Sequence, residues 1–369
     1  MASVSLRNLW KKYGKVEAVK GINLEVKDKE FVAFLGPSGC GKTSTMRMIA
    51  GLEHITAGEI YIGDKLVNHL GPEERNIAMA FESYALYPPM TVFDNIAFPL
   101  RAAKVPEKEI KERVYRIAEV LELTDVLNKY PKGLSGGHQQ RVSLARALVR
   151  DAEVYLLDEP ISHLDTKMRN RMRAELKRIH QELKSTVIYV THDQIEALAM
   201  ADKVVVMSEG FIKQVGTPQE VYFKPRNLFV ADFVGEPPMN FLDCKVSLGE
   251  KDCQIIIDSL SFKVFDPEKM AALKAAKTAK LDKLILGIRP CHIDILTESA
   301  VLDGREIRGK VFLVEPLGDS NIVHVKMNEN LLLIETITAV EKKEGDDILI
   351  RFQEEHLHLF DKESEEAIF

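Results

Sequence analysis

The feature that most constrains this chain is a glycine-rich loop at residues 36–43, Gly-Pro-Ser-Gly-Cys-Gly-Lys-Thr. The loop fits the pattern G-x-x-x-x-G-K-[ST], and it lies between the apolar run at residues 31–35 and a predicted helix, the context that the pattern requires. Its glycines allow a tight turn whose N–H groups converge on phosphate oxygens, and a helix N-terminus adds partial positive charge. The residues predicted to bind the phosphates are Gly36, Pro37, Ser38, Gly39, Cys40, Gly41, Lys42, Thr43 and Ser44.

Two side chains of this loop and two carboxylates further on predict the chemistry. Lys42 is expected to bridge the β- and γ-phosphates of a nucleotide and to act in catalysis, and the Thr43 hydroxyl is expected to bind Mg²⁺. Asp158 and Glu159 end a second apolar run, so Asp158 is assigned to the metal and Glu159 to the general base that orients the attacking water. An Asp-Glu pair after a strand also occurs as a helix N-cap, and the phosphate loop favours the catalytic interpretation.

Apolar runs alternate with helical patterns as far as about residue 232. The runs are typical of strands buried on both faces, and helices between them, notably at residues 164–183, predict a parallel α/β sheet. Ligands bind at the carboxyl ends of such strands. Residues 106–123 and 136–150 predict further helices, which we interpret as a helical subdomain at about residues 83–150. The apolar runs are residues 31–35, 154–157, 186–190 and 204–207.

The pattern changes after Pro238, which predicts a second domain at residues 236–369. This part has 17 basic and 26 acidic residues, a balance of −9, whereas residues 1–235 have 33 and 30, a balance of +3. Apart from a predicted helix at residues 267–279, it contains short β-like runs, which favour a small barrel or sandwich. These runs are residues 241–246, 254–257, 284–288, 309–314, 321–327, 331–334, 347–352 and 356–360.

Composition argues against several classes of protein. The net charge of −6 disfavours a chain that coats nucleic acid, so no nucleic-acid partner is expected. No stretch of 18 apolar residues is present, and the N-terminal residues lack the apolar centre of a signal peptide. The four cysteines form no C-x-x-C pair, which disfavours zinc and thiol redox chemistry and fits a reducing cytosol.

A second glycine turn lies at residues 134–141, Leu-Ser-Gly-Gly-His-Gln-Gln-Arg. Ser135, Gly136 and Gly137 open a predicted helix and therefore form a second anion-binding N-terminus. One nucleotide does not need two such sites from one chain. The economical arrangement is a pair of chains, in which each chain offers this turn to the γ-phosphate bound by the other.

With these motifs the chain resembles the ATPase subunits of ABC transporters, and more narrowly those of the maltose- and multiple-sugar-importer type. The resemblance covers essentially the whole length. It implies an α/β P-loop NTPase fold, that of an ABC ATPase with a helical subdomain, followed by a β-rich, OB-like regulatory and dimerisation domain. The matching segments are residues 36–43, 83–88, 134–141, 157–160, 164–165, 191–193, 216–222, 287–290 and 315–318.

The resemblance also implies roles for single residues, with ATP and Mg²⁺ as cofactors. Tyr13 corresponds to the aromatic residue that stacks on adenine, with Val16 beside it, although a half-exposed turn aromatic is the alternative. His192 corresponds to the histidine that contacts the γ-phosphate. Asp165 corresponds to a loop that crosses the dimer interface and joins the two nucleotide sites.

The partners that the resemblance implies are a second ATPase subunit and two membrane-spanning permease subunits. The permeases would dock on the stretch from Ser83 to Asn95, which is unusually apolar for a loop. A loop folded on its own core is the alternative. A solute-binding protein outside the cell would act indirectly, and this chain would work peripherally at the cytoplasmic face of the membrane.

Three positions depart from the family pattern: Glu82 and His138 stand where glutamine is usual, and His163 where asparagine is usual. A carboxylate at position 82 can still bind Mg²⁺. Either the departures are tolerated and hydrolysis is intact, or the chain pairs with a different ATPase subunit and supplies one altered site. Because histidine titrates near neutrality, His138 or His163 is also expected to make activity sensitive to pH.

The sequence therefore predicts an ATP-hydrolysing subunit of an importer for a carbohydrate or polyol. A pair of these domains would close head-to-tail on two Mg·ATP molecules. Two alternatives stay open at this point: an ABC ATPase that acts on nucleic acid or ribosomes rather than in transport, and a regulatory subunit that leaves most turnover to a partner.

Overall fold

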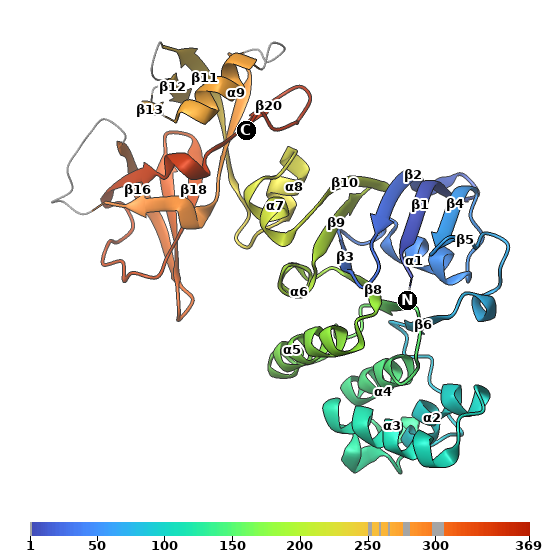
Figure 1. Cartoon of the computed structure of the whole chain (residues 1–369). Coiled ribbons are helices and arrows are strands. Elements are labelled where there is room, and N and C mark those ends of the chain that lie inside the picture. The colour runs from blue at the N-terminus through green and yellow to red at the C-terminus, as the bar shows by residue number, and fades with distance from the viewer. Residues whose placement is uncertain (1, 250–252, 258–259, 265, 276–280, 297–305) are drawn as a thin grey trace. The chain divides into compact units, whose positions relative to one another are not determined.

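The computed structural model describes residues 2–249, 253–257, 260–264, 266–275, 281–296 and 306–369 (Figure 1). Contacts within the chain divide it into two compact units, Met1–Pro218 and Gln219–Phe369. The division falls before residue 235, where the charge pattern suggested a boundary, because Arg289 of the second unit donates hydrogen bonds to the carbonyl oxygens of Tyr222 and Val234. The second unit therefore holds most of α7 (Pro218–Phe223) and all of α8 (Leu228–Phe233).

The first unit contains the predicted parallel sheet. Its strand order is β10-β9-β3-β8-β7-β6, with β10 antiparallel to β9 and the other neighbouring strands parallel. Every residue of β3, β7 and β8 is buried, which confirms the interpretation of the apolar runs. The strands are β3 (Phe31–Leu35), β6 (Ile77–Ala80), β7 (Val154–Asp158), β8 (Thr186–Thr191), β9 (Lys203–Ser208) and β10 (Phe211–Gly216).

A four-stranded antiparallel sheet, which the sequence pattern did not reveal, packs in the same unit. Its order is β2-β1-β4-β5. Register shifts interrupt the β1–β2 pairing, so the alternation of apolar residues is broken within each strand. One hydrophobic core joins this sheet, α1 (Lys42–Ala50) and the parallel sheet. The strands are β1 (Val4–Tyr13), β2 (Val16–Val26), β4 (Ala57–Ile62) and β5 (Lys65–Leu66).

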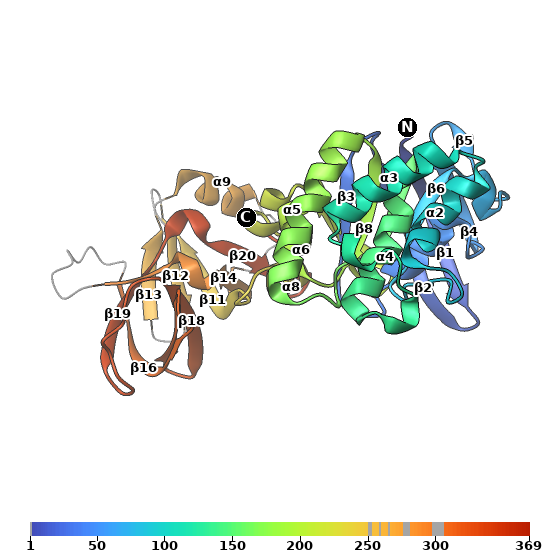
Figure 2. The same cartoon turned by 90° about the horizontal axis from the view of Figure 1, so that it is seen from below.

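Three helices between β6 and β7 form the predicted helical part, seen as one group in Figures 1 and 2. In α3 the apolar side chains of Ile110, Val114 and Ile117 recur at helical spacing and are buried. Within the described part of the chain, no helix is both long and apolar enough to cross a bilayer. Besides α1, the helices described in the first unit are α2 (Val92–Ala102), α3 (Glu107–Val120), α4 (Gly136–Leu148), α5 (Thr166–Leu183), α6 (Gln194–Met200), η1 (Pro72–Glu74), η2 (Thr124–Val126) and η3 (Pro131–Gly133).

The second unit contains two five-stranded antiparallel sheets, of order β13-β12-β11-β14-β20 and β15-β19-β16-β17-β18. Most predicted β-like runs are strands here. The strands are β11 (Asn240–Leu248), β12 (Cys253–Ile257), β13 (Leu260–Val264), β14 (Leu284–Ile288), β15 (Ile293–Ile295), β16 (Glu306–Pro316), β17 (Asn321–Met327), β18 (Asn330–Thr336), β19 (Asp347–Phe352) and β20 (His358–Asp361).

Short helices complete the second unit. The run predicted from residue 356 begins instead as the end of η5 (Glu354–His356), and β20 starts two residues later. The predicted helix at 267–279 is α9 (Pro267–Ala275), and residues 276–279 lie outside the described residues. A further 3-10 turn is η4 (Pro290–His292).

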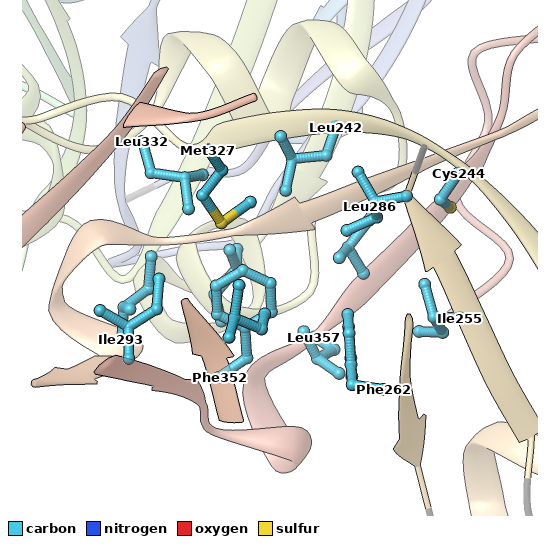
Figure 3. Close-up of a cluster of buried hydrophobic side chains, with 14 of the residues drawn as sticks. Leu242, Cys244, Ile255, Phe262, Leu286, Ile293, Met327, Leu332, Phe352 and Leu357 are labelled. Atoms are coloured by element: carbon cyan, nitrogen blue, oxygen red, sulfur yellow. The ribbon is translucent and has the colours of Figure 1, made fainter. Parts of the chain in front are cut away.

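The two sheets of the second unit share one apolar core, shown in Figure 3. Side chains from both sheets point toward one another there, among them Leu286 and Phe262 from the first sheet and Phe352 and Met327 from the second. The Phe262 and Phe352 rings meet edge to face, with 5.4 Å between the ring centres. The β-rich domain predicted from the sequence is therefore held together by its own core.

Candidate active site

The glycine-rich loop joins the end of β3 to the start of α1, as the sequence predicted. Two of its glycines are required by space. A Cβ at Gly36 would lie 2.2 Å from the Met207 carbonyl oxygen, and a Cβ at Gly41, where φ is 107°, would lie 2.5 Å from the Ala18 carbonyl oxygen. The loop is thus packed against the backbone of β9 and β2, and only glycine lets it approach so closely.

Lys42 is buried in the hollow of this loop, with 6% of its surface exposed. Its Nζ donates hydrogen bonds to the carbonyl oxygens of Gly36 (2.7 Å) and Pro37 (3.0 Å) and lies 3.7 Å from Cys40 Sγ. The cation is therefore held inside the loop that would surround the phosphates, where its charge acts in a desolvated setting.

Thr43 and Asp158 come together at the end of β7, where the Thr43 hydroxyl donates to Asp158 Oδ1 at 3.3 Å. Burial, aided by the nearby carboxylates of Glu82 and Glu159, raises the pKa of Asp158 to about 6 against the opposing effect of the Thr43 hydrogen bond. Carboxylate and hydroxyl oxygens gathered in this way suit a hard cation, because its charge offsets the repulsion between the carboxylates.

This donor set fits Mg²⁺ in the form usual for nucleotide sites. No group of three or more His, Cys, Asp or Glu residues in the described ranges is arranged to hold a metal by itself. Mg²⁺ needs fewer protein ligands, because it is commonly held by one or two carboxylates or hydroxyls together with phosphate oxygens. Thr43, Asp158 and the exposed Glu82 just after β6 are the residues that could supply them.

Glu159 and His192 form a contact between the ends of β7 and β8. His192 Nδ1 lies 3.0 Å from Glu159 Oε1, and the Glu159 side chain is 20% exposed against 60% for His192. Glu159 has a φ of 45°, and its N–H donates to the Val190 carbonyl oxygen at 2.9 Å. A non-glycine residue in this strained conformation is typical of functional sites, and the carboxylate can reach a water molecule from here.

The Ser-Gly-Gly turn begins α4, as predicted. Ser135 is the N-cap, and a 2.7 Å hydrogen bond joins its Oγ to His138 Nδ1. Gly137 packs so closely that a Cβ there would lie 3.1 Å from Leu164 Cδ2. Burial, together with the Arg141 and Lys129 charges, lowers the pKa of His138 below its ordinary value.

Asp165 caps the helix that follows the carboxylate pair. Its Oδ1 accepts a hydrogen bond from the Met168 N–H at 2.9 Å, and α5 starts at the next residue. The alternative that Asp158-Glu159 is itself a helix cap is therefore wrong. We call residues 162–165, which contain His163 and Asp165, the interface loop, after the role that the resemblance implies.

Tyr13 and Val16 lie opposite each other in the β1–β2 pairing and are exposed, by 43% and 65%. Lys11 Nζ lies 4.6 Å from the centre of the Tyr13 ring. Because Ala18 of β2 lies against Gly41, this turn is close to the phosphate loop. An exposed aromatic face near a phosphate site is suited to stack on a flat ring.

The stretch from Ser83 to Asn95, called the docking segment below, is a loop that runs into α2. Its far end is folded on the core, since Val92 and Asn95 are buried, and the Asn95 side chain bonds to the backbone of Tyr87 and Met90. Its near end exposes apolar surface, with Tyr87 40% exposed. The stretch is thus folded on its own core at the far end and leaves apolar surface exposed at the near end, and its role in docking stays a prediction.

Two polar residues of α4 received no role from the sequence. Gln140 bonds to the backbone of Glu159, and Arg146 bonds to the carbonyl oxygens of Tyr84 and Ala85. They lie four and ten residues after the start of a helix that begins with an anion-binding turn. This position was only a weak indication of a role. Only the folded chain shows that they reach the backbone of Glu159 and of the docking segment.

Comparison with known proteins agrees with this geometry. Family models match residues 19–162 (ABC transporter), 235–293 (MalK OB fold domain) and 286–360 (TOBE domain). The trehalose/maltose import ATP-binding protein MalK of Thermococcus litoralis is 47% identical over 377 residues, with both chains fully covered. The oligosaccharides import ATP-binding protein MsmX of Bacillus subtilis is 44% identical, also over the full length of both chains.

A third relative and a solved structure extend the comparison. The sn-glycerol-3-phosphate import ATP-binding protein UgpC of Ralstonia nicotianae is 42% identical over 100% of this chain and 99% of its own. A dimeric ATP-binding cassette in a post-hydrolysis state, bound to ADP and Pi, is 32% identical with a TM-score of 0.55, over 58% of this chain and 98% of its own. The chain belongs to the ATP-binding subunits of ABC transporters, is an ATPase, and is of the sugar-importer type with a C-terminal OB-fold region.

Proposed function

We propose that this chain drives an importer for a carbohydrate or polyol by binding and hydrolysing ATP as one of a pair of ATPase subunits. The observation that carries the proposal is the contact between Glu159 and His192. This contact lies beside the Thr43–Asp158 pair, at the edge of the sheet that bears the phosphate loop. The solutes named for three of its relatives are trehalose or maltose, oligosaccharides and sn-glycerol-3-phosphate.

The chain's own residues divide the work of hydrolysis. The N–H groups of residues 36–44 and the Lys42 ammonium bind the phosphates, and Tyr13 with Val16 receives the adenine ring. Glu159 takes the proton of the attacking water, and His192 holds the Glu159 carboxylate and contacts the γ-phosphate. Thr43, Asp158 and Glu82 would hold Mg²⁺, which would supply positive charge to offset the charge of the phosphates.

The second anion-binding turn explains why two chains are needed. Ser135, Gly136 and Gly137 present a capped helix N-terminus, and Asp165 lies on the interface loop. We propose that each turn meets the γ-phosphate held by the partner chain, so that ATP closes the pair and hydrolysis reopens it. The dimeric state of the related cassette that holds ADP and Pi supports this arrangement.

We also propose how the chain is organised and where it works. Residues 1–235 act as the nucleotide-binding domain, with a helical subdomain at about residues 83–150, and residues 236–369 act as a regulatory and dimerisation domain. The docking segment, from Ser83 to Asn95, receives two membrane-spanning permease subunits at the cytoplasmic face of the membrane. A solute-binding protein on the other side acts through those subunits.

The test is the ATPase rate of the purified chain as a function of its concentration, with Glu159→Gln as the blank. We expect a rate per chain that rises with concentration, because two copies must meet to complete each site. If the rate stays at the level of the blank although ATP binds, the working motor needs another ATPase subunit, and the homodimer is wrong. If Glu159→Gln turns over as fast as the wild type, Glu159 is not the base.

A further inference from the structure

Helix α4 carries one functional part of the first unit at its N-terminus and holds two others by its side chains. Its N-terminus carries the Ser-Gly-Gly turn, Gln140 follows one turn later, and Arg146 lies near its end. Gln140 contacts the segment after β7, and Arg146 contacts the docking segment. The relative positions of these parts are therefore set by α4.

Gln140 fixes the backbone beside the catalytic carboxylate. Its side chain is buried, with 1% exposed, and Nε2 donates to the Glu159 carbonyl oxygen at 2.8 Å and to Ser162 Oγ at 3.2 Å. Its Oε1 accepts from the His163 N–H at 3.0 Å. One amide thus holds both ends of residues 159–163, including the Glu159 peptide in its left-handed conformation.

Arg146 fixes the start of the docking segment in a similar way. Its two Nη atoms donate to the carbonyl oxygens of Ala85 at 2.7 Å and Tyr84 at 3.1 Å. Tyr84 and Ala85 both have positive φ, 61° and 47°, a conformation that needs outside support in non-glycine residues. The forked guanidinium supplies that support, since it binds two adjacent carbonyl groups at once.

A side-chain contact connects the docking segment to the interface loop directly. A hydrogen bond of 2.9 Å joins Tyr84 Oη to His163 Nδ1, and the two rings meet edge to face at 5.7 Å. The Tyr84 hydroxyl also lies close to Gly136, since a Cβ on that glycine would be 3.5 Å from the hydroxyl oxygen. The docking segment, interface loop and Ser-Gly-Gly turn therefore meet around the Tyr84 hydroxyl.

We propose that Tyr84 and His163 are positioning residues for ATP hydrolysis, and that their hydrogen bond makes the place of the Glu159 peptide depend on the docking segment. A partner that moves the docking segment must move His163 or break this bond, and Gln140 passes the change to Glu159 through the bonds described above. The proposal rests on the proposed function, in which Glu159 is the base. It assigns a use to His163, one of the three departures from the family pattern.

The test is a double-mutant cycle on the purified chain, with Tyr84→Phe, His163→Ala and the pair combined. We expect each single change to lower kcat about two- to tenfold, the range of one solvent-exposed hydrogen bond, with the KM for ATP little changed. The double variant should lose no more than the worse single variant, because both remove the same bond. Losses that multiply, or a change confined to KM, would overturn the proposal.

Two controls separate positioning from folding. His163→Asn should keep most of kcat, because the Asn side-chain amide reaches about the position of Nδ1, and equal losses for Asn and Ala would contradict the proposal. Tyr130→Phe removes a hydroxyl from an exposed tyrosine of the helical part and should leave kcat unchanged.

A second measurement does not depend on turnover. The ¹⁵N chemical shift of His163 Nδ1 should differ between the wild type and Tyr84→Phe, because the partner of one ring nitrogen sets the tautomer. An unchanged shift would show that the bond does not form and would refute the proposal even in an active enzyme. If instead the wild type hydrolyses no faster than Glu159→Gln while the shift does change, the homodimer of the proposed function fails and the bond stands.

Discussion

At the scale of single residues, the space around its glycines limits which residues the phosphate loop can contain. The site of a Cβ on Gly36 is only 2.2 Å from a backbone oxygen of β9, which cannot move without disturbing the sheet. At Gly14, by contrast, φ is 57° and a Cβ would meet nothing within 4 Å. The two positions therefore separate steric overlap from backbone strain.

We predict that Gly36→Ala lowers the free energy of unfolding of the first unit by about 2–3 kcal/mol, the usual effect of overpacking. Gly14→Ala should lower it by only about 1 kcal/mol, the cost of a left-handed conformation in a residue with a side chain. Urea unfolding without nucleotide, followed by the fluorescence of Trp10, measures both. Equal effects would show that the loop can move away from β9.

The His138 side chain gives a prediction about pH. Burial and two nearby cations lower its pKa below the ordinary value, which favours the neutral ring. ATPase rates of the wild type and His138→Gln should therefore follow the same pH profile above about pH 6.5 and diverge only in more acidic solution. An activity limb centred above pH 7 that His138→Gln removes would contradict this prediction.

At the scale of elements, the buried parallel strands were predictable and the β1–β2 hairpin was not. Strands covered on both faces leave continuous apolar runs, which are visible in any sequence. In β1 the buried positions Leu6 and Leu9 are separated by a register shift, so no strict alternation marks the strand. Irregular pairing of this kind is decided by the neighbouring strand rather than by the local sequence.

The contact between α4 and the docking segment leads to a prediction at the same scale. Arg146→Met keeps an apolar stem but leaves the Tyr84 and Ala85 carbonyl groups without their donor. We expect faster amide hydrogen exchange at residues 83–90 and a loss of about 1–3 kcal/mol of stability. Mass spectrometry of exchange measures the first effect and urea unfolding the second.

Arg146→Lys is the matched control for this prediction. It keeps the positive charge but cannot bind both carbonyl groups with a planar fork, so its exchange rate should lie between those of the wild type and Arg146→Met. If Arg146→Lys exchanges like the wild type, charge rather than geometry holds the docking segment.

At the scale of the whole molecule, acid should destabilise the second unit more than the first. In the second unit, burial lowers the pKa of His358 to about 3 and of His292 to about 4, from an ordinary value of 6.5. Below pH 6.5 these two histidines therefore bind protons in the unfolded chain but stay neutral in the folded unit. The free energy of unfolding consequently falls between pH 6.5 and 4. In the first unit, burial raises the pKa of Glu196, so the folded form binds that proton first, and this gain of stability at low pH offsets the opposite effect of the lowered pKa of His138.

We therefore predict that, on acidification to about pH 4.5, the second unit unfolds while Trp10, the single tryptophan and a residue of β1, still reports a folded first unit. Circular dichroism would record the loss of the second unit, and Trp10 fluorescence the first. His358→Phe should shift the acid transition to lower pH, because it removes a group that must be neutral when buried. Simultaneous loss of both signals would contradict the prediction.

The sequence by itself determined the class of fold and the position of the phosphate loop, because buried strands, glycine turns and capped helices leave local patterns. It also indicated Asp158 and Glu159, which end a buried strand of the same sheet, whereas His192 was indicated by the resemblance to the family. Only the tertiary structure decided that Tyr84 reaches His163 and that Gln140 holds the Glu159 peptide. These contacts join segments between 19 and 79 positions apart, and their energy depends on the packing of α4 rather than on any nearby residue pattern.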